Sequence, residues 1–139
     1  MDYDEIFQKY LLTDKWEDKN AAYKEQLRLI KQITTQFPKD KAENLSWFIA
    51  SLRENQKKWF VAKVLDKVNP FPHSLFQDTL LAALVEENPS AIRLYLYPCV
   101  RQFGVEAVVK EIQRLSVLPE VIKHDGVSKV SYALEFCNV

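Results

Sequence analysis

The stretch NLSWFIASLRENQKKWFVAKVL, residues 44–65, contains two similar tetrapeptides, WFIA beginning at Trp47 and WFVA beginning at Trp59. Apolar residues recur every three or four positions on either side of its polar centre, as they do on a helix with one buried face. We therefore predict two helices, 41–54 and 57–68, joined by a short turn. The two tetrapeptides then belong to the two different helices of one hairpin.

A second hairpin follows at a shift of 32 residues, beyond the helix-breaking segment Asn69-Pro-Phe-Pro72. Similar residues pair in this register as follows: Phe48 with Leu80, Ile49 with Leu81, Ala50 with Ala82, Leu52 with Leu84, Glu54 with Glu86, Phe60 with Ile92, Val64 with Leu96 and Val68 with Val100. Helical hairpins repeated every 30 to 50 residues or so are typical of α-solenoids. The predicted fold class is all-α, with stacked antiparallel helical hairpins.

Helix boundaries are marked by residues with specific backbone roles. Residues 40–43 and 74–77 match the capping box, and Asn88 followed by proline matches an N-cap. Gly104 predicts a helix end. Pro98 predicts a kink or a short break near Tyr97.

The flanking segments are also mainly helical in pattern. One long helix is predicted from Thr13 to Phe37, with its buried face formed by Trp16, Tyr23, Leu27, Ile30, Ile33 and Phe37. Beyond Gly104 we expect a helix to Leu115, while residues 127–137 fit either a helix or a strand. The chain is thus read as one domain, 1–139, with N-terminal capping helices (1–38), two hairpins (40–68 and 74–103) and a C-terminal helix and cap (104–139).

Composition agrees with this class and limits the possible functions. The 139 residues are 47% hydrophobic and include only two glycines, and 19 basic side chains balance 19 acidic ones. Such a balance provides no overall field for non-specific binding to nucleic acid or anionic membrane. With no signal-like or membrane-spanning apolar segment, we expect a soluble cytoplasmic protein. Cys99 and Cys137 are expected to be free thiols.

No pattern of catalytic or ligand residues emerges from the sequence. His73 and His124 have no Ser or Cys nucleophile at an informative spacing, and no Zn²⁺, Ca²⁺ or phosphate-loop motif is present. We expect no enzymatic activity, no metal and no cofactor.

The segment Asn88-Pro-Ser-Ala-Ile-Arg93 resembles the turn into the second helix of a HEAT repeat. The stretch 58–65 is similar to the start of that helix in another unit, although Ala62 stands where the family has a basic residue. The resemblance covers about residues 40–115 and implies a short HEAT-like α-solenoid whose second helices line a concave face.

These second helices have an excess of positive charge. Residues 55–71 carry four lysines against one aspartate, and residues 89–103 carry two arginines and no acid. The first helices are net acidic, which implies a basic inner face with aromatic residues among the charges. The binding residues predicted on this face are Lys58, Trp59, Lys63, Lys67, Arg93, Tyr97 and Arg101.

Three functions fit this reading. The first is a non-catalytic module that binds an acidic protein or peptide. The second is a HEAT-like nucleic-acid-binding protein, whose enzymatic form would resemble a DNA glycosylase; Asp66 is the only acid on either second helix. The third, a regulator acting on another protein's cofactor, has no residue in its favour. The oligomeric state is left open.

Overall fold

The computed structural model describes residues 1–38 and 41–137, which form only helices, turns and loops. The α-helices in this part of the chain are α1 (Tyr3–Leu12), α2 (Lys19–Thr35), α3 (Ser46–Ser51), α4 (Lys57–Asp66), α5 (Phe76–Leu84), α6 (Ile92–Leu115), α7 (Pro119–Lys123) and α8 (Gly126–Leu134). Short 3-10 turns occur at Thr13–Lys15, Ala42–Asn44, His73–Leu75 and Pro89–Ala91. The all-α prediction is confirmed, and α8 resolves the choice between helix and strand for the C-terminal segment.

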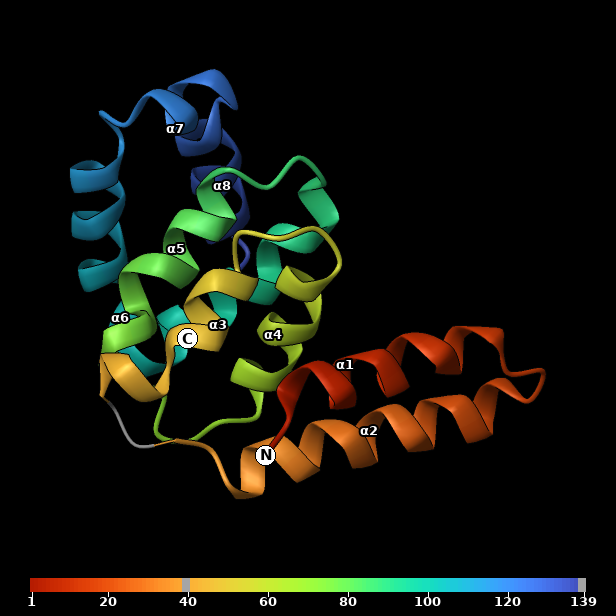
Figure 1. The fold of residues 1–139 in the computed structure, drawn as a ribbon. Helices are drawn as coiled ribbons and strands as arrows, with labels where there is room; N and C mark the ends of the chain where they lie inside the picture. Colours follow the sequence, from red (N-terminus) through yellow and green to blue (C-terminus); the bar gives the residue numbers. More distant parts are fainter. Residues whose placement is uncertain (39–40, 138–139) are drawn as a thin grey trace.

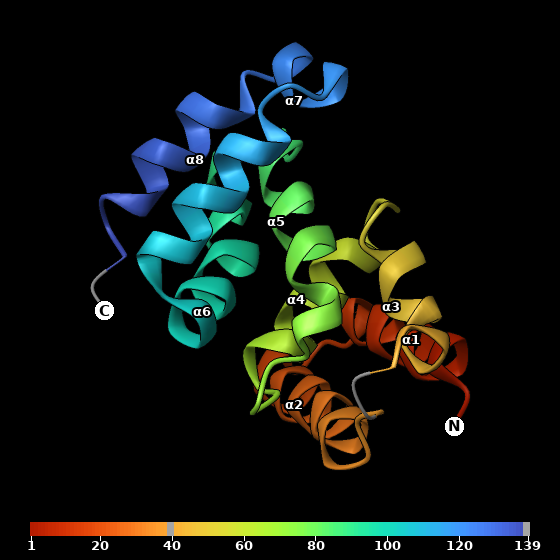
Figure 2. The same cartoon turned by 90° about the vertical axis from the view of Figure 1, so that its left-hand side faces the viewer.

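Helix α6 lies at the centre of the molecule and packs against α4, α5 and α8. Helices α1 and α2 form an antiparallel hairpin that packs on α4 and projects away from the body (Figure 1). Helices α7 and α8 lie at the opposite end (Figure 2). None of the helices in the described ranges is both long and apolar enough to cross a membrane.

The 32-residue register of the predicted hairpins selects core positions only in part, because Ala50 is exposed whereas its partner Ala82 is buried. Four of its pairs are almost completely buried on both sides: Phe48 and Leu80, Leu52 and Leu84, Phe60 and Ile92, and Val64 and Leu96. The pair of Glu54 and Glu86 differs, because Glu54 is exposed whereas Glu86 is only 2% exposed. This difference places a carboxylate inside the protein at a position where the sequence predicts a solvated helix end.

The break in α6 lies at Gly104 and not next to Pro98. Gly104 adopts φ 86° and ψ 158°, whereas the residues around Pro98 keep helical backbone angles. A glycine adopts positive φ without steric cost, so the chain can change direction here and start a second helical segment at once. The predicted end of the helix at Gly104 is therefore a change of direction within α6.

The long N-terminal helix predicted from Thr13 to Phe37 is present as α2 (Lys19–Thr35), but it begins later than predicted. Thr13 ends the first of two helices: it is buried, and its hydroxyl donates to the Tyr10 carbonyl and accepts from Gln26 Nε2. Asp18 caps α2 by accepting from the Ala21 N–H at 3.1 Å. Thr13 and Asp18 therefore lie at the two ends of the turn that joins α1 to α2.

The buried face of α2 is also rotated from the predicted one. Ala22, Leu29, Ile30 and Ile33 are buried, whereas Tyr23 is 62% and Leu27 is 40% exposed. The reason is that α2 packs against α1 and α4 and leaves its outer side to solvent.

Two predicted helix starts can be compared with the structure. Asn88 Oδ1 accepts from the Ser90 N–H at 3.0 Å, so the cap before α6 is confirmed. Helix α5 begins at Phe76, after a 3-10 turn, and not at the predicted Ser74. The capping box at 40–43 begins outside the described residues. Cys99 is a buried free thiol, and Cys137 is a half-buried one.

Candidate functional site

A glycine allows α8 to lie close to the body of the protein. A Cβ atom on Gly126 would lie 1.9 Å from the backbone oxygen of Leu84, so only glycine fits at this contact between α8 and α5. The preceding residue, Asp125, provides the turn with φ 52°. Val130, one turn further along α8, is fully buried. The outer face of α8 is thereby placed next to the start of α6.

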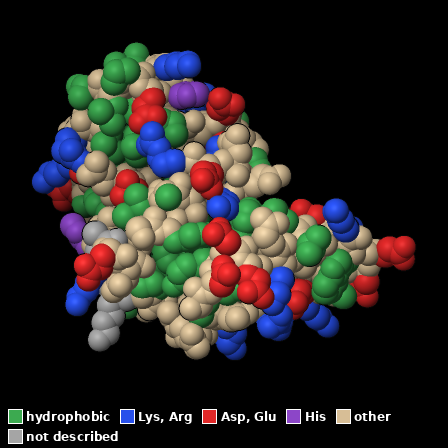
Figure 3. All heavy atoms as spheres, viewed as in Figure 1, with side chains coloured by type: hydrophobic (Ala, Val, Ile, Leu, Met, Phe, Trp, Pro, Cys, Tyr) green, Lys and Arg blue, Asp and Glu red, His purple; other side chains and the backbone are tan. Residues whose placement is uncertain are grey.

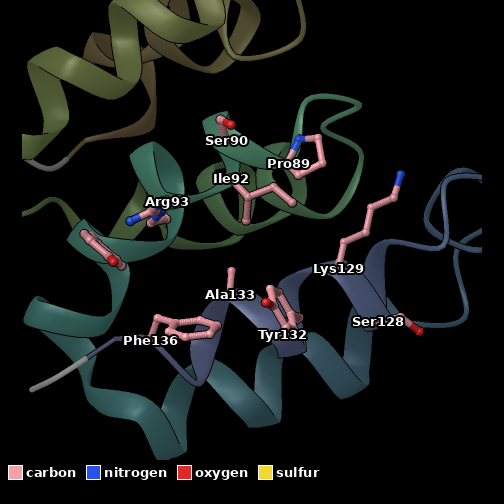
Figure 4. A pocket seen from close by; sticks show the side chains of 10 residues that line it. Pro89, Ser90, Ile92, Arg93, Ser128, Lys129, Tyr132, Ala133 and Phe136 are labelled. Atoms are coloured by element: carbon pink, nitrogen blue, oxygen red, sulfur yellow. The ribbon is translucent and has the colours of Figure 1, made fainter.

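A cavity of about 640 Å³ lies between α6 and α8. Side chains from α6 and the turn before it face those of α8 across its opening (Figure 4). The lining residues are Pro89, Ser90, Ile92, Arg93, Tyr97, Ser128, Lys129, Tyr132, Ala133 and Phe136. The volume lies in the range of sites that bind small molecules or a short peptide segment.

The charge of this lining has a single sign. Arg93 and Lys129 are its only charged residues, and within the described part of the chain neither forms an ion pair. Arg93 also acts at a distance on Cys137: burial raises the pKa of that thiol, while the arginine charge opposes the increase. The cavity therefore offers two cations that no carboxylate of residues 1–38 and 41–137 pairs with.

Aromatic rings form the other part of the surface. Tyr132 is 66% and Phe136 is 55% exposed, and their centroids lie 5.1 Å apart. Aromatic residues and arginine are enriched among the residues that anchor protein partners, so these rings beside Arg93 favour a protein ligand. With no acid, histidine or cysteine among the lining residues, this cavity is suited to binding acidic groups and apolar side chains.

The structure brings together only some of the seven predicted binding residues. Arg93 and Tyr97 line the cavity between α6 and α8. Lys67 and Arg101 line a second hollow of about 310 Å³. The remaining three lie elsewhere: Lys58 and Trp59 border a third hollow, and Lys63 donates to the Tyr10 hydroxyl at 2.9 Å.

Arg101 already has a carboxylate partner. Its guanidinium lies 2.8 Å from Asp66 Oδ1 and also donates to the Asp66 carbonyl oxygen. The only acid on the predicted inner face is therefore paired with one of the cations predicted to bind a ligand.

Lys58 and Trp59 are directed toward an internal carboxylate. The Trp59 indole N–H donates to Glu86 Oε1 at 2.7 Å, and the Tyr95 hydroxyl donates to the same oxygen at 2.9 Å. The other oxygen accepts from the Asn88 N–H at 3.1 Å and lies 3.4 Å from Lys58 Nζ. We call these five residues the Glu86 cluster.

The cluster holds Glu86 in its charged form. Burial alone raises the pKa of this carboxyl group, but hydrogen bonds from Asn88, Trp59 and Tyr95 together with the Lys58 charge outweigh burial, and the pKa lies below its ordinary value. Burial also raises the pKa of Tyr95, so its hydroxyl remains a donor. Because every donor is directed at Glu86, the cluster is a structural contact between α4, α5 and α6.

Sequence analysis does not select Lys129, Tyr132 or Phe136 as binding residues. Their spacing of i, i+3 and i+7 is that of one face of a helix, and Phe136 lies just beyond the end of α8. A search for this spacing would have found them, had residues 127–137 been assigned as helix. The apolar content of that stretch fits a strand equally well, and a strand would place these residues on both of its faces.

Comparisons of the chain with protein-family models, with curated proteins and with solved structures found no match. Among residues 1–38 and 41–137, no group of three or more His, Cys, Asp or Glu side chains is arranged to hold a metal ion. The function must therefore be inferred from the cavity itself.

Proposed function

We propose that the protein is a non-catalytic interaction module that binds an acidic segment of another protein in the cavity between α6 and α8. The observation that carries this proposal is the position of Arg93 and Lys129, which form no ion pair with any described residue, beside the exposed rings of Tyr132 and Phe136. A segment with carboxylates next to an aromatic or aliphatic side chain would complement both parts of the surface.

The cations contribute more to specificity and association rate than to affinity at the rim of such a site. Arg93 can hold a carboxylate with two parallel hydrogen bonds, because its guanidinium is planar. The aromatic rings supply rigid contact area at a low cost in side-chain entropy. Together they favour a partner in which one apolar anchor lies between two acids.

Of the residues predicted on the basic and aromatic face, only Arg93 and Tyr97 line the proposed binding cavity. Residues of α8 line its other side. The HEAT-like stack belongs to the proposal too, and it is supported by the common buried register of the two hairpins. In this view the C-terminal cap contributes to binding as well as to closing the stack. A cytoplasmic location would suit a module with free thiols.

The proposal is tested by fluorescence anisotropy with a labelled DEWED peptide. Arg93→Glu should weaken binding about tenfold or more, because reversing the charge both removes the attraction and adds repulsion. The matched control is Lys67→Glu, which reverses the charge of another exposed cation in a different hollow and should change binding by less than about twofold. Equal effects of the two variants would exclude the cavity as the site.

A parallel titration with a labelled single-stranded DNA oligomer separates the two classes of partner. Binding that is tighter than that of the peptide and falls steeply with salt would indicate phosphate neutralisation and would overturn the proposal in favour of nucleic-acid binding. The ion pair between Asp66 and Arg101 makes the glycosylase-like form of that alternative harder to sustain, since the acid is already engaged.

A further inference from the structure

The end of the α1–α2 hairpin carries an exposed apolar group that has no role in the core. We define the tip as residues 12–19, which join α1 to α2. Leu12 is 54% and Trp16 is 41% exposed. The tip is the part of the molecule farthest from its body, and hydrophobic side chains there lie among charged ones (Figures 1 and 3).

Acidic side chains flank the tryptophan. Asp14 and Glu17 are exposed, and neither carboxylate forms an ion pair within the described ranges. Asp18 is occupied by capping α2. Of the two lysines in the tip, Lys19 is held by the Asp14 carbonyl oxygen at 2.9 Å, and Lys15 is exposed.

The shape of the tip is held by internal contacts. Thr13 is buried and hydrogen-bonded on both sides, to Tyr10 and to Gln26, while Asp18 secures the start of α2. A segment that is already ordered loses little conformational entropy when it binds. The tip thus presents one aromatic anchor between two free carboxylates in a preorganised turn.

We propose that the tip of one molecule inserts into the cavity between α6 and α8 of a second copy of this chain. The inference rests on the proposed function and names its partner. Trp16 would lie against Tyr132 and Phe136, and Asp14 and Glu17 would pair with Arg93 and Lys129. The Asp14 and Glu17 carboxylates are opposite in charge to Arg93 and Lys129, and none of these four side chains forms an ion pair with another described residue of its own molecule.

The placement of the two surfaces dictates a head-to-tail arrangement. The hairpin packs on α4 at one end of the molecule, and the cavity lies at the other end (Figures 1 and 2). The tip therefore cannot enter the cavity of its own chain. Each molecule offers one tip and one cavity, so association is heterologous and continues until a ring closes or a chain of copies forms.

Sedimentation velocity on the full chain tests the proposal. The wild-type protein should show a weight-average mass that rises with concentration. The tip variant Trp16→Ser and the cavity variant Arg93→Glu should each remain monomeric. A mixture of the two should form a 1:1 dimer, because each variant retains the surface that the other lacks.

Two controls keep the result interpretable. Tyr23→Ser removes an aromatic side chain that is 62% exposed on α2 outside the tip, and self-association should be unchanged. Circular dichroism of the variants should match that of the wild type, because Trp16, Tyr23 and Arg93 are exposed.

Each other outcome contradicts the inference in a recognisable way. A wild-type chain that stays monomeric while binding the DEWED peptide rejects self-insertion and leaves the proposed function intact. A chain that neither associates nor binds the peptide rejects both. If either variant still self-associates, the molecules associate through other surfaces. The same conclusion follows if the two variants do not form a dimer when mixed.

Discussion

Glu86 connects three helices through a single carboxylate. It lies just beyond the end of α5. Its carboxylate accepts hydrogen bonds from Trp59 and Lys58 of α4 and from Tyr95 of α6. Removing a carboxylate from water costs several kcal/mol, roughly, and this cost is offset only when its oxygens are fully hydrogen-bonded. The four donors around Glu86 meet that condition.

Glu86→Gln should lower the free energy of unfolding by about 3 kcal/mol, because it leaves Lys58 without its partner and places an amide N–H₂ opposite existing donors. Urea denaturation measures the change. Glu54→Gln is the matched control: it makes the same chemical change at the exposed position 32 residues earlier, and it should cost less than about 0.5 kcal/mol. Equal costs at the two positions would contradict the structural role of the cluster.

The contribution of Glu86 should also depend on pH. The folded-state pKa of this group lies below its ordinary value, so its stabilisation is complete above the unfolded-state pKa and is lost as the pH falls through the folded-state pKa. The difference in unfolding free energy between the wild type and Glu86→Gln should therefore shrink as the pH is lowered from about 6 to about 3. A difference that stays constant over this range would show that folding does not change the pKa of Glu86.

At the level of elements, the two glycines of the chain serve different needs. Gly104 has open space around its Cα, but its φ of 86° is one that other residues adopt only with strain. Gly126 needs no unusual angle, because Asp125 takes the positive φ of that turn, yet it has no room for a Cβ. One glycine redirects α6, and the other allows α8 to approach α5.

Gly126→Ala should destabilise the protein by about 2–3 kcal/mol, because the added methyl group overlaps the Leu84 carbonyl and α8 must move away. Displacement of α8 should also weaken binding of the DEWED peptide, since α8 forms one wall of the cavity. Ser131→Ala, an exposed position on the same helix, is the control and should leave both quantities nearly unchanged. Unchanged stability of Gly126→Ala would mean that α8 does not approach α5 so closely.

On the scale of the whole molecule, ion pairs join segments that are distant in the sequence. Asp4 and Lys57 connect α1 to α4, and Arg53 and Glu120 connect the end of α3 to α7. These pairs are largely solvent-exposed, and exposed pairs typically contribute less than about 1 kcal/mol. The continuous core centred on α6 is therefore what holds the helices together.

The molecule is also asymmetric in the surfaces that it exposes. The α1–α2 hairpin leaves an aromatic and acidic tip in solvent, and α6 and α8 enclose a basic and aromatic cavity at the other end. Because these features are on opposite sides, any contact between them joins different molecules. The shape of the fold thus limits what kind of assembly the chain can form.

Local patterns in the sequence were sufficient to predict several features. Helical periodicity and scarce glycine predicted the all-α class, the register of the two hairpins predicted buried residues such as Phe48 and Leu80, and the cap at Asn88 was found where expected. Periodicity and helix caps depend on residues within a few positions of one another, which a sequence displays directly, and the 32-residue register is a repeat of such a local pattern.

Only the tertiary structure decided which polar side chains are enclosed and which cations remain free. Nothing near Glu86 in the sequence indicates that Trp59 and Lys58, 27 and 28 residues earlier, will enclose it. Likewise, Arg93 and Lys129 share a cavity only because Gly126 lets α8 pack against α5. Burial and pairing of charges depend on which helix faces pack together, and that choice is made by contacts between residues far apart in the chain.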